Sequence, residues 1–273
     1  MTPDQGMTQK PEEINWDRFR RAYEYAAAGK ADTSMITGKG EPTLFPEHIS
    51  QYLNGLLEAE KRFGYRIRIR ELQTNGVSIA DGKVDDLLYL WRAGNLHTVA
   101  VSIAHFEPEV NREIFLPYRR SYIDLSKLVN KLHQADYGVR LACVLFKGGI
   151  DNSRKLKQLI EFSKDNHVEE LTVRPVNMPT ESGDQEVAEW VREHSLEKGQ
   201  LEDIEAYLRE NGVVTREFPF GGSVYSIFSV RSQNVCLTSC LTKDKPNKFL
   251  RQLIFYPNGR IATDWTEKGE GLK

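Results

Sequence analysis

The sequence predicts an α/β fold, built as a full or partial barrel of parallel strands with crossover helices. One observation is that five short apolar strands alternate with helical patterns, at a spacing of roughly 30–40 residues. Such alternation is typical of parallel strands whose connecting helices pack on the sheet. A second observation is the length of 273 residues, which is enough to bury a substantial core. A third is that turn glycines and small polar side chains stand where each strand should end.

The helices of the predicted barrel are placed by apolar residues at helical spacing and by their stop signals. The first spans residues 11–28 and has Gly29 as its stop. The second begins at Pro46, which suits a first helical turn, and ends at Gly64. Further helices are expected near residues 85–92, from Asp124 onward, and near residues 152–166.

The predicted strands are short apolar segments that alternate with these helices. In the segment 65–72, isoleucines alternate with Arg66, Arg68 and Arg70 before a turn at residues 73–76. We assign the three arginines to the polar face of the strand, and a phosphate site is the alternative. The five strands are expected at residues 34–37, 65–72, 98–103, 139–146 and 170–173.

The character of the chain changes after about Pro179, so we divide it into a barrel region, residues 1–179, and a C-terminal α+β extension, residues 180–273. The extension begins with a charged stretch, 181–197, which we interpret as a solvated helix, with a mobile lid as the alternative. A helix at 201–211 and strands at 224–230 and 249–256 follow. Asn258-Gly259 then predicts a hairpin that leads into a strand up to Trp265. We expect the extension to pack on the barrel.

Composition and charge exclude several functional classes. The net charge of −2 gives no general electrostatic reason to bind nucleic acid or an anionic membrane. No apolar run approaches the roughly 20 residues of a membrane span, and the N-terminal residues resemble neither a signal peptide nor a transit peptide. Three cysteines are too few for a disulfide framework. These features predict a cytoplasmic protein.

Candidate functional residues follow the predicted strands, where the loops of a parallel barrel converge on one face. Gly38 and Gly40 would let a ligand lie against the main chain, and Glu41 offers an acceptor-only group that suits a cationic amine. The other strand ends carry residues 74–76, 102–105, 147–149 and 174–179.

These segments, in their order along the chain, resemble the radical S-adenosylmethionine (SAM) superfamily, most closely the molybdopterin-biosynthesis cyclase and peptide-maturation enzymes. The resemblance covers nearly the whole chain. The matching residues are Thr37-Gly38-Lys39-Gly40-Glu41-Pro42-Thr43-Leu44, Thr74-Asn75-Gly76, Val101-Ser102-Ile103, Gly148-Gly149-Ile150-Asp151, Val173-Arg174-Pro175 and Phe220-Gly221-Gly222. It implies a partial (βα)6 TIM-like barrel that lacks its first strand in this sequence.

The resemblance also implies a cofactor and its contacts. Reductive cleavage of SAM at a [4Fe–4S] cluster would generate a 5′-deoxyadenosyl radical that abstracts hydrogen from a substrate, either a small molecule or a peptide. A reductant such as a flavodoxin or a ferredoxin would be a partner. The implied contacts with SAM are Gly38, Gly40, Glu41 and Pro42 at the amino group, Ser102 at the ribose or carboxylate, Thr74 and Asn75 between cofactor and substrate, and Arg174 with Asn177 beside the adenine.

One departure from the family is decisive. Members hold the cluster with a C-x3-C-x2-C run, because such clusters require thiolate ligands, and this run is absent. No cysteine precedes Cys143. We therefore expect the sequence to begin after the cysteine segment, so that this chain would be a shortened and inactive form. A cluster-less protein that binds SAM, a nucleotide or a peptide is the alternative.

Several of these residues also have ordinary structural interpretations. Glu41 can be a solvated carboxylate at a helix start, and Ser102 a core hydroxyl. His105 can be a substrate-side base, but a structural role is favoured. Cys236 and Cys240 fall short of the usual ligand count for a metal site, so we assign no metal ligands and no catalytic residue. A barrel lyase or aldolase is a third hypothesis, for which Lys39 and Lys147 would be the candidate lysines.

Overall fold

A computed structural model describes residues 13–38, 40–115, 120–176, 185–220, 223–238 and 252–263. Within them, ten strands form two sheets. The strands are β1 (Thr33–Ile36), β2 (Ile69–Thr74), β3 (Thr98–Ile103), β4 (Gly138–Leu145), β5 (Glu170–Pro175), β6 (Gly212–Phe220), β7 (Ser223–Val230), β8 (Gln233–Thr238), β9 (Ile254–Phe255) and β10 (Ile261–Ala262).

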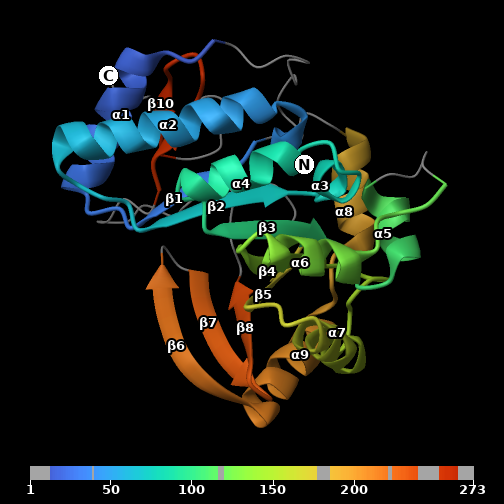
Figure 1. Ribbon diagram of the computed structural model, residues 1–273. Coiled ribbons are helices and arrows are strands. Elements are labelled where there is room, and N and C mark those ends of the chain that lie inside the picture. Colours follow the sequence, from blue (N-terminus) through green and yellow to red (C-terminus); the bar gives the residue numbers. More distant parts are fainter. Residues whose placement is uncertain are drawn as a thin grey trace.

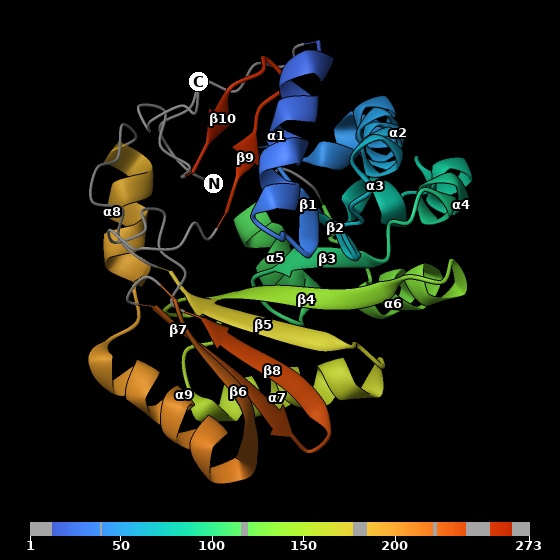
Figure 2. The same ribbon diagram turned by 90° about the vertical axis from the view of Figure 1, so that its left-hand side faces the viewer.

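The larger sheet has eight strands in the order β1-β2-β3-β4-β5-β8-β7-β6. Strands β1 to β5 pair in parallel with their sequence neighbours, and β8 continues the parallel set beside β5. The hairpin strands β7 and β6 then extend the sheet in antiparallel fashion. Because β1 and β6 are its two edges, the sheet is an open arc, as Figure 1 and Figure 2 show. The predicted α/β partial barrel is confirmed.

The described helices are given by their bounds as follows: α1 (Trp16–Ala28), η1 (Pro42–Leu44), α2 (Pro46–Phe63), α3 (Val77–Ala80), α4 (Asp85–Ala93), α5 (Pro108–Phe115), α6 (Leu125–Gln134), α7 (Ser153–Asp165), α8 (Gln185–His194) and α9 (Lys198–Asn211). Figure 2 shows α2, α4, α6, α7 and α9 along the convex side of the arc. None of the helices in this part of the chain has the length and apolar character to cross a bilayer.

The main hydrophobic core lies between the convex face of the sheet and these helices. Alternate residues of a strand point to the same face, and the residues of β3 that face the helices are Val99, Val101 and Ile103. They pack in the same buried cluster as Leu128 and Leu132 of α6. The predicted start of this helix is confirmed, because Asp124 caps it by accepting a hydrogen bond from the Lys127 amide at 3.1 Å.

A second core joins the two ends of the described chain. Phe19 of α1 packs edge-on against Phe255 of β9, with ring centroids 5.3 Å apart. Strands β9 and β10 form the hairpin predicted from Asn258-Gly259. In Figure 2 this hairpin lies beside α1. The expected flanking strand residues 249–251 and Trp265 lie outside the described residues.

The C-terminal region adds more to the sheet than the sequence indicated. Neither β6 nor β8 was predicted, although β8 supplies the sixth parallel strand. The β7–β8 connection is a two-residue turn at Arg231 and Ser232, both with positive φ. Glycine or asparagine usually marks such a turn, so the sequence carries no signal there. The charged stretch predicted as a helix contains α8, whereas residues 181–184 lie outside the described part.

The polar face assigned to Arg66, Arg68 and Arg70 was wrong for Arg70. Its side chain is 1% exposed and faces the helical layer, while Ile69 is 45% exposed. Arg70 donates to Glu60 of α2 at 2.5 Å and to the Gly94 carbonyl at 2.6 Å. A buried charge needs such partners, and α2 provides one. The strand also starts later than predicted, at Ile69.

The concave face of the sheet is polar. Glu71 of β2 forms a bidentate ion pair with Arg140 of β4. Arg140 also donates to the Thr172 hydroxyl of β5 at 3.2 Å, and Thr172 donates to Glu170 at 2.9 Å. These groups satisfy one another near the N-terminal ends of the strands. The loops that carry the candidate site residues leave from the opposite, C-terminal ends of these strands.

Candidate functional site

Glu41 connects the loop after β1 to the end of β2. Its Oε1 accepts hydrogen bonds from the Thr43 amide at 3.0 Å, the Thr43 hydroxyl at 2.6 Å and the Thr74 hydroxyl at 2.6 Å. Its Oε2 accepts one from the Asn75 amide at 2.7 Å. Each carboxylate oxygen has about two lone-pair sites. Among the described residues, Oε1 is therefore filled, and Oε2 retains capacity for one further donor.

The local sequence explains why Glu41 is held in this position. Pro42 occupies the first position of η1, where its missing N–H costs nothing, and Glu41 caps that short helix through the Thr43 amide. The structure thus brings together three of the predicted site residues, Glu41, Thr74 and Asn75. It also adds Thr43, which is 2% exposed and was matched by the resemblance without a role.

The end of β2 is fixed by its own turn. The Gly76 amide donates to the Thr74 hydroxyl at 3.0 Å, and the Val77 amide donates to the Asn75 side chain at 2.9 Å as α3 begins. Gly76 has φ of +76°, and an added Cβ would lie 2.5 Å from the Cδ2 of Leu128. Gly76 is therefore required by the fold itself.

Gly38 differs from Gly76 both in its φ and in the space around an added Cβ. Its φ lies outside the left-handed region, and the nearest atom to an added Cβ would be the Gly40 amide nitrogen at 3.9 Å. Gly38 and Gly40 are both exposed. The described residues therefore give no packing reason for glycine at position 38, and a molecule lying against this backbone would provide one. Lys39, between them, lies outside the described residues.

Tyr122 is a neighbour of this site that the sequence did not indicate. Its hydroxyl donates to the Asn75 carbonyl at 3.4 Å. Burial raises the pKa of the Tyr122 hydroxyl, and the negative charge of Glu41 raises it further, so Tyr122 stays a neutral donor. Tyr122 lies in the loop before α6, far from Asn75 in the sequence, and only the folded structure brings the two residues together. No local sequence motif marks Tyr122 as a site residue.

Ser102 and Arg174 lie on the concave face, away from Glu41 in the sheet order. Ser102 in β3 is half-buried and pairs in register with Ala142 of β4. Arg174 in β5 is exposed and pairs in register with Val144. The structure does not bring these two into contact with the Glu41 group through any hydrogen bond between described residues. Asn177 lies outside the described residues.

His105 belongs to the packing between β3 and α7. Its ring stacks on Phe106 at 4.3 Å, and Phe106 stacks on Phe162 of α7 at 5.9 Å. Its Nδ1 accepts a hydrogen bond from the Glu107 amide at 3.0 Å, so the neutral ring carries its proton on Nε2. Burial lowers the pKa of His105. The structural interpretation of this histidine fits these contacts. Lys147 pairs with Glu197 at 2.7 Å.

The described thiols do not fit an iron–sulfur cluster. Cys143 points toward the helical layer, and burial raises the pKa of its thiol. Cys236 pairs in register with Thr172 and so faces the concave side. Two thiols on opposite faces of a sheet cannot share a cluster, which needs several converging thiolates. Among the described residues no group of three or more metal-binding side chains occurs. Cys240 lies outside them.

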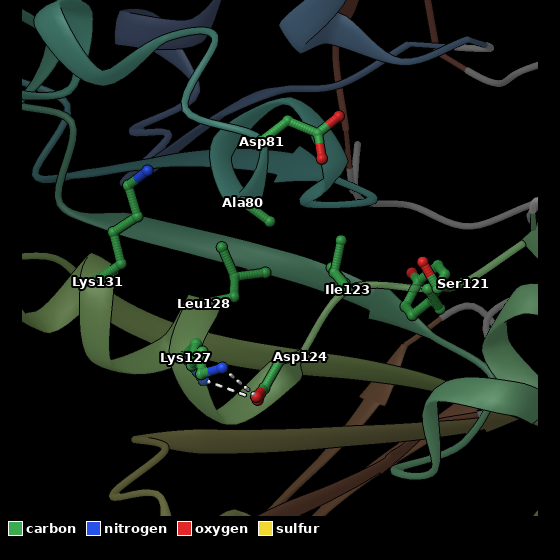
Figure 3. Close-up of a pocket in the computed structure, with 9 residues that line it drawn as sticks. Ala80, Asp81, Ser121, Ile123, Asp124, Lys127, Leu128 and Lys131 are labelled. Atoms are coloured by element: carbon green, nitrogen blue, oxygen red, sulfur yellow. Dashed lines mark hydrogen bonds and ion pairs between the residues drawn. The ribbon is translucent and has the colours of Figure 1, made fainter. Parts of the chain in front are cut away.

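A cavity of about 230 Å³ adjoins the site between α3 and the start of α6 (Figure 3). Tyr122 lines it and connects it to Asn75. Its charged groups are paired with other described residues: Lys127 contacts Asp124 at 3.4 Å, Lys131 contacts Asp85 at 2.6 Å, and Asp81 contacts Lys83 at 3.3 Å. These pairs give the cavity no uncompensated charge with which to select a ligand.

The fold is similar to that of known radical SAM enzymes. The structure of SuiB from Streptococcus suis bound to S-adenosylmethionine has a TM-score of 0.55 with 14% sequence identity, and the match covers 98% of this chain and 57% of that one. A second structure of SuiB from Streptococcus suis has a TM-score of 0.53 with 14% sequence identity, and the match covers 97% of this chain and 58% of that one. The structure of a radical SAM methyltransferase from Sphaerobacter thermophilus has a TM-score of 0.49 with 19% sequence identity, and the match covers 70% of this chain and 51% of that one.

The comparisons by sequence found nothing. No family model matches the chain, and no curated protein matches it. The chain spans less than two thirds of the length of the SuiB structures. At 14% identity the likeness is one of fold.

Proposed function

We propose that this chain forms the SAM-binding part of a radical SAM enzyme. The observation that carries the proposal is the Glu41 carboxylate, held at the ends of β1 and β2 beside an exposed Gly38 backbone. A carboxylate next to bare main chain suits the ammonium group of an amino acid. The fold likeness to SuiB, whose structure is bound to S-adenosylmethionine, supports the choice of ligand.

In this proposal each residue has a defined role toward SAM. Glu41 receives the ammonium group through the remaining acceptor capacity of Oε2, and Gly38 and Gly40 allow close approach of the methionyl part. Thr74 and Asn75 hold Glu41 in position and border the substrate. Pro42 fixes the backbone at the start of η1.

Two further contacts are assigned on the other strands. Ser102 serves the ribose or the carboxylate of SAM from the concave face of β3. The backbone of the segment from Arg174 to Asn177 flanks the adenine.

The reaction itself depends on a cofactor and a cluster in addition to the described residues. In radical SAM enzymes the cofactor supplies hydrogen abstraction through a 5′-deoxyadenosyl radical. The protein binds the cofactor, orients the substrate and excludes water. The described thiols do not form a site for a [4Fe–4S] cluster. A flavodoxin or ferredoxin as reductant, a small molecule or peptide as substrate, and a cytoplasmic location remain parts of the proposal.

Calorimetric titration of SAM into the purified chain tests the proposal. We expect Gly38→Val to weaken SAM binding by roughly tenfold or more, because the added side chain occupies the approach to the main chain. Gly199→Val is the matched control, since Gly199 in α9 also has room for a Cβ and no positive φ. Both variants should melt within a few degrees of the parent. Absence of SAM binding, or equal affinities for both variants, would contradict the proposal.

A second candidate is a cluster-less protein that uses the same loop to hold SAM, a nucleotide or a peptide. The positions of Cys143 and Cys236 on opposite faces favour it. Anaerobic reconstitution with iron and sulfide, followed by visible absorbance and iron analysis, tests the second candidate. A stable stoichiometric cluster would exclude the second. SAM binding without any cluster is expected of both candidates, whereas tighter binding of a nucleotide or a peptide than of SAM would favour the second.

A further inference from the structure

The C-terminal ends of β5 and β8 carry two polar groups whose hydrogen-bonding capacity the described residues leave unused. Thr238 is 4% exposed, and its hydroxyl has no hydrogen-bond partner among the described residues. Arg174 is exposed, and no described residue forms an ion pair or hydrogen bond with its guanidinium. Buried polar groups are nearly always partnered, so the Thr238 hydroxyl has capacity for a polar partner that the described residues do not supply.

The strand register places these two side chains together. Thr172 pairs with Cys236 and Val173 with Leu237, so Arg174 and Thr238 are the next pair along β5 and β8. Neighbouring strands lie about 4.8 Å apart. By alternation from Thr172, both side chains point to the concave face.

Among the described residues, no acidic side chain pairs with Arg174. Val144 occupies the register position beside it in β4. The nearest acidic residue of the same strand, Glu170, lies four positions away, roughly 13 Å along β5, and accepts a hydrogen bond from Thr172. Deeper on the concave face, Glu71 is paired with Arg140.

The geometry points to an anion site at this pair: Arg174 and Thr238 bind a carboxylate or phosphate group of the substrate. A guanidinium presents a rigid fork of donors that matches the oxygens of either anion, and the hydroxyl supplies one more donor. This inference rests on the proposed function and deepens it, because it assigns the substrate an acidic group. The backbone of the same segment keeps its role beside the adenine.

The carboxylate of SAM is excluded as this anion by distance. In SAM the ammonium and carboxylate groups share one carbon atom, so both lie close to Glu41 at the ends of β1 and β2. Strand β5 is three strands from β2 in the sheet, which is on the order of 14 Å at the usual spacing. Among the described residues, the strand ends therefore carry the Glu41 carboxylate on the β1–β2 side and the Arg174 guanidinium on the β5–β8 side, which suits a cationic cofactor and an anionic substrate.

Titration of the chain with inorganic phosphate, followed by phosphorus NMR line broadening, tests the inference without SAM. We expect Arg174→Gln to weaken phosphate binding by at least about tenfold and Thr238→Val by about threefold. Thr238→Ser keeps the hydroxyl and should bind phosphate as the parent does. Arg66→Gln is the matched control, because Arg66 is exposed and loses the same charge outside the concave face.

Competition experiments identify the source of the anion. If acetate displaces phosphate more strongly than a salt of the same ionic strength does, the substrate carries a carboxylate group. If acetate does not, the substrate carries a phosphate group. Displacement of phosphate by SAM would overturn the assignment to substrate. Phosphate binding unchanged in both Arg174→Gln and Thr238→Val, or equally weakened in Arg66→Gln, would overturn the site itself. If the parent binds phosphate as expected but does not bind SAM, the proposed function fails while the anion site stands.

Discussion

Thr74 links Glu41 to the turn at the end of β2, so removing its hydroxyl tests the arrangement of the site directly. The hydroxyl donates to Glu41 Oε1 at 2.6 Å and accepts from the Gly76 amide at 3.0 Å. Because Thr74 is only 3% exposed, water does not replace either partner. Thr74→Val keeps the shape of the side chain and breaks both hydrogen bonds, whereas Thr74→Ser keeps both and removes one methyl group.

The magnitude follows from these two bonds. A hydrogen bond to a charged group contributes about 1.5–3 kcal/mol and a neutral one about 0.5–1.5 kcal/mol. Since Glu41 is half-buried, solvent screening favours the lower end of the charged range. We therefore expect Thr74→Val to lower the free energy of unfolding by roughly 2–3 kcal/mol. Thr74→Ser should cost about 1 kcal/mol, from the methyl group alone.

Urea unfolding followed by circular dichroism measures both variants against the parent. A double-mutant cycle with Glu41→Gln isolates the contact, and its coupling energy should be about 1 kcal/mol or more. SAM affinity, measured by calorimetry on the same proteins, should fall in Thr74→Val and persist in Thr74→Ser. Equal losses of stability in the valine and serine variants, together with zero coupling to Glu41, would refute the reasoning.

Three further predictions concern the frame around the site. Arg70→Met leaves the carboxylate of Glu60 buried and unpaired, so the free energy of unfolding should drop by roughly 3–5 kcal/mol in urea titrations, and adding Glu60→Gln should recover part of it. Burial lowers the pKa of His105, so the unfolded chain takes up the proton first as pH falls below about 6.5. Stability should therefore decline below that pH, and His105→Gln should flatten the decline. Gly76→Ala combines a positive φ with a 2.5 Å clash and should cost roughly 2–4 kcal/mol in thermal unfolding, whereas Gly64→Ala, with φ of +63° and open space, should cost only the strain.

The sequence predicted the parallel part of the fold because its physical signals are local. Thr98–Ile103 was placed with its observed bounds, since a buried parallel strand reads as a short apolar run between polar turns. The missed strand β8 has a weaker pattern, and its turn uses Arg231 and Ser232 at positive φ in place of glycine. Arg70 faces the helices although the alternation predicted the polar face, because its ion-pair partner Glu60 comes from a different element, α2.

The sequence indicated which residues lie near one another in the candidate site, but not which hydrogen bonds join them. The convergence of loops at the ends of parallel strands predicted that Glu41, Thr74 and Asn75 would be neighbours. That Thr43 and Thr74 would fill one oxygen of the carboxylate depends on the geometry of η1, which no residue pattern reveals. Tyr122 enters from a loop between α5 and α6, so its contact with Asn75 is a property of the packed structure.

Gly38 and Gly76 differ in why glycine is needed: the fold requires Gly76, whereas only a bound ligand would require Gly38. Gly76 is explained by its positive φ and by Leu128, so its replacement must destabilise the chain whether or not a ligand binds. Gly38 has neither constraint, and the fold tolerates a Cβ there. If replacement of Gly38 leaves stability unchanged and removes ligand binding, the ligand lies against that backbone. The structure therefore makes Gly38, rather than the well-anchored Glu41, the cleaner probe of binding, because every change at Glu41 also alters the hydrogen bonds of Thr43, Thr74 and Asn75.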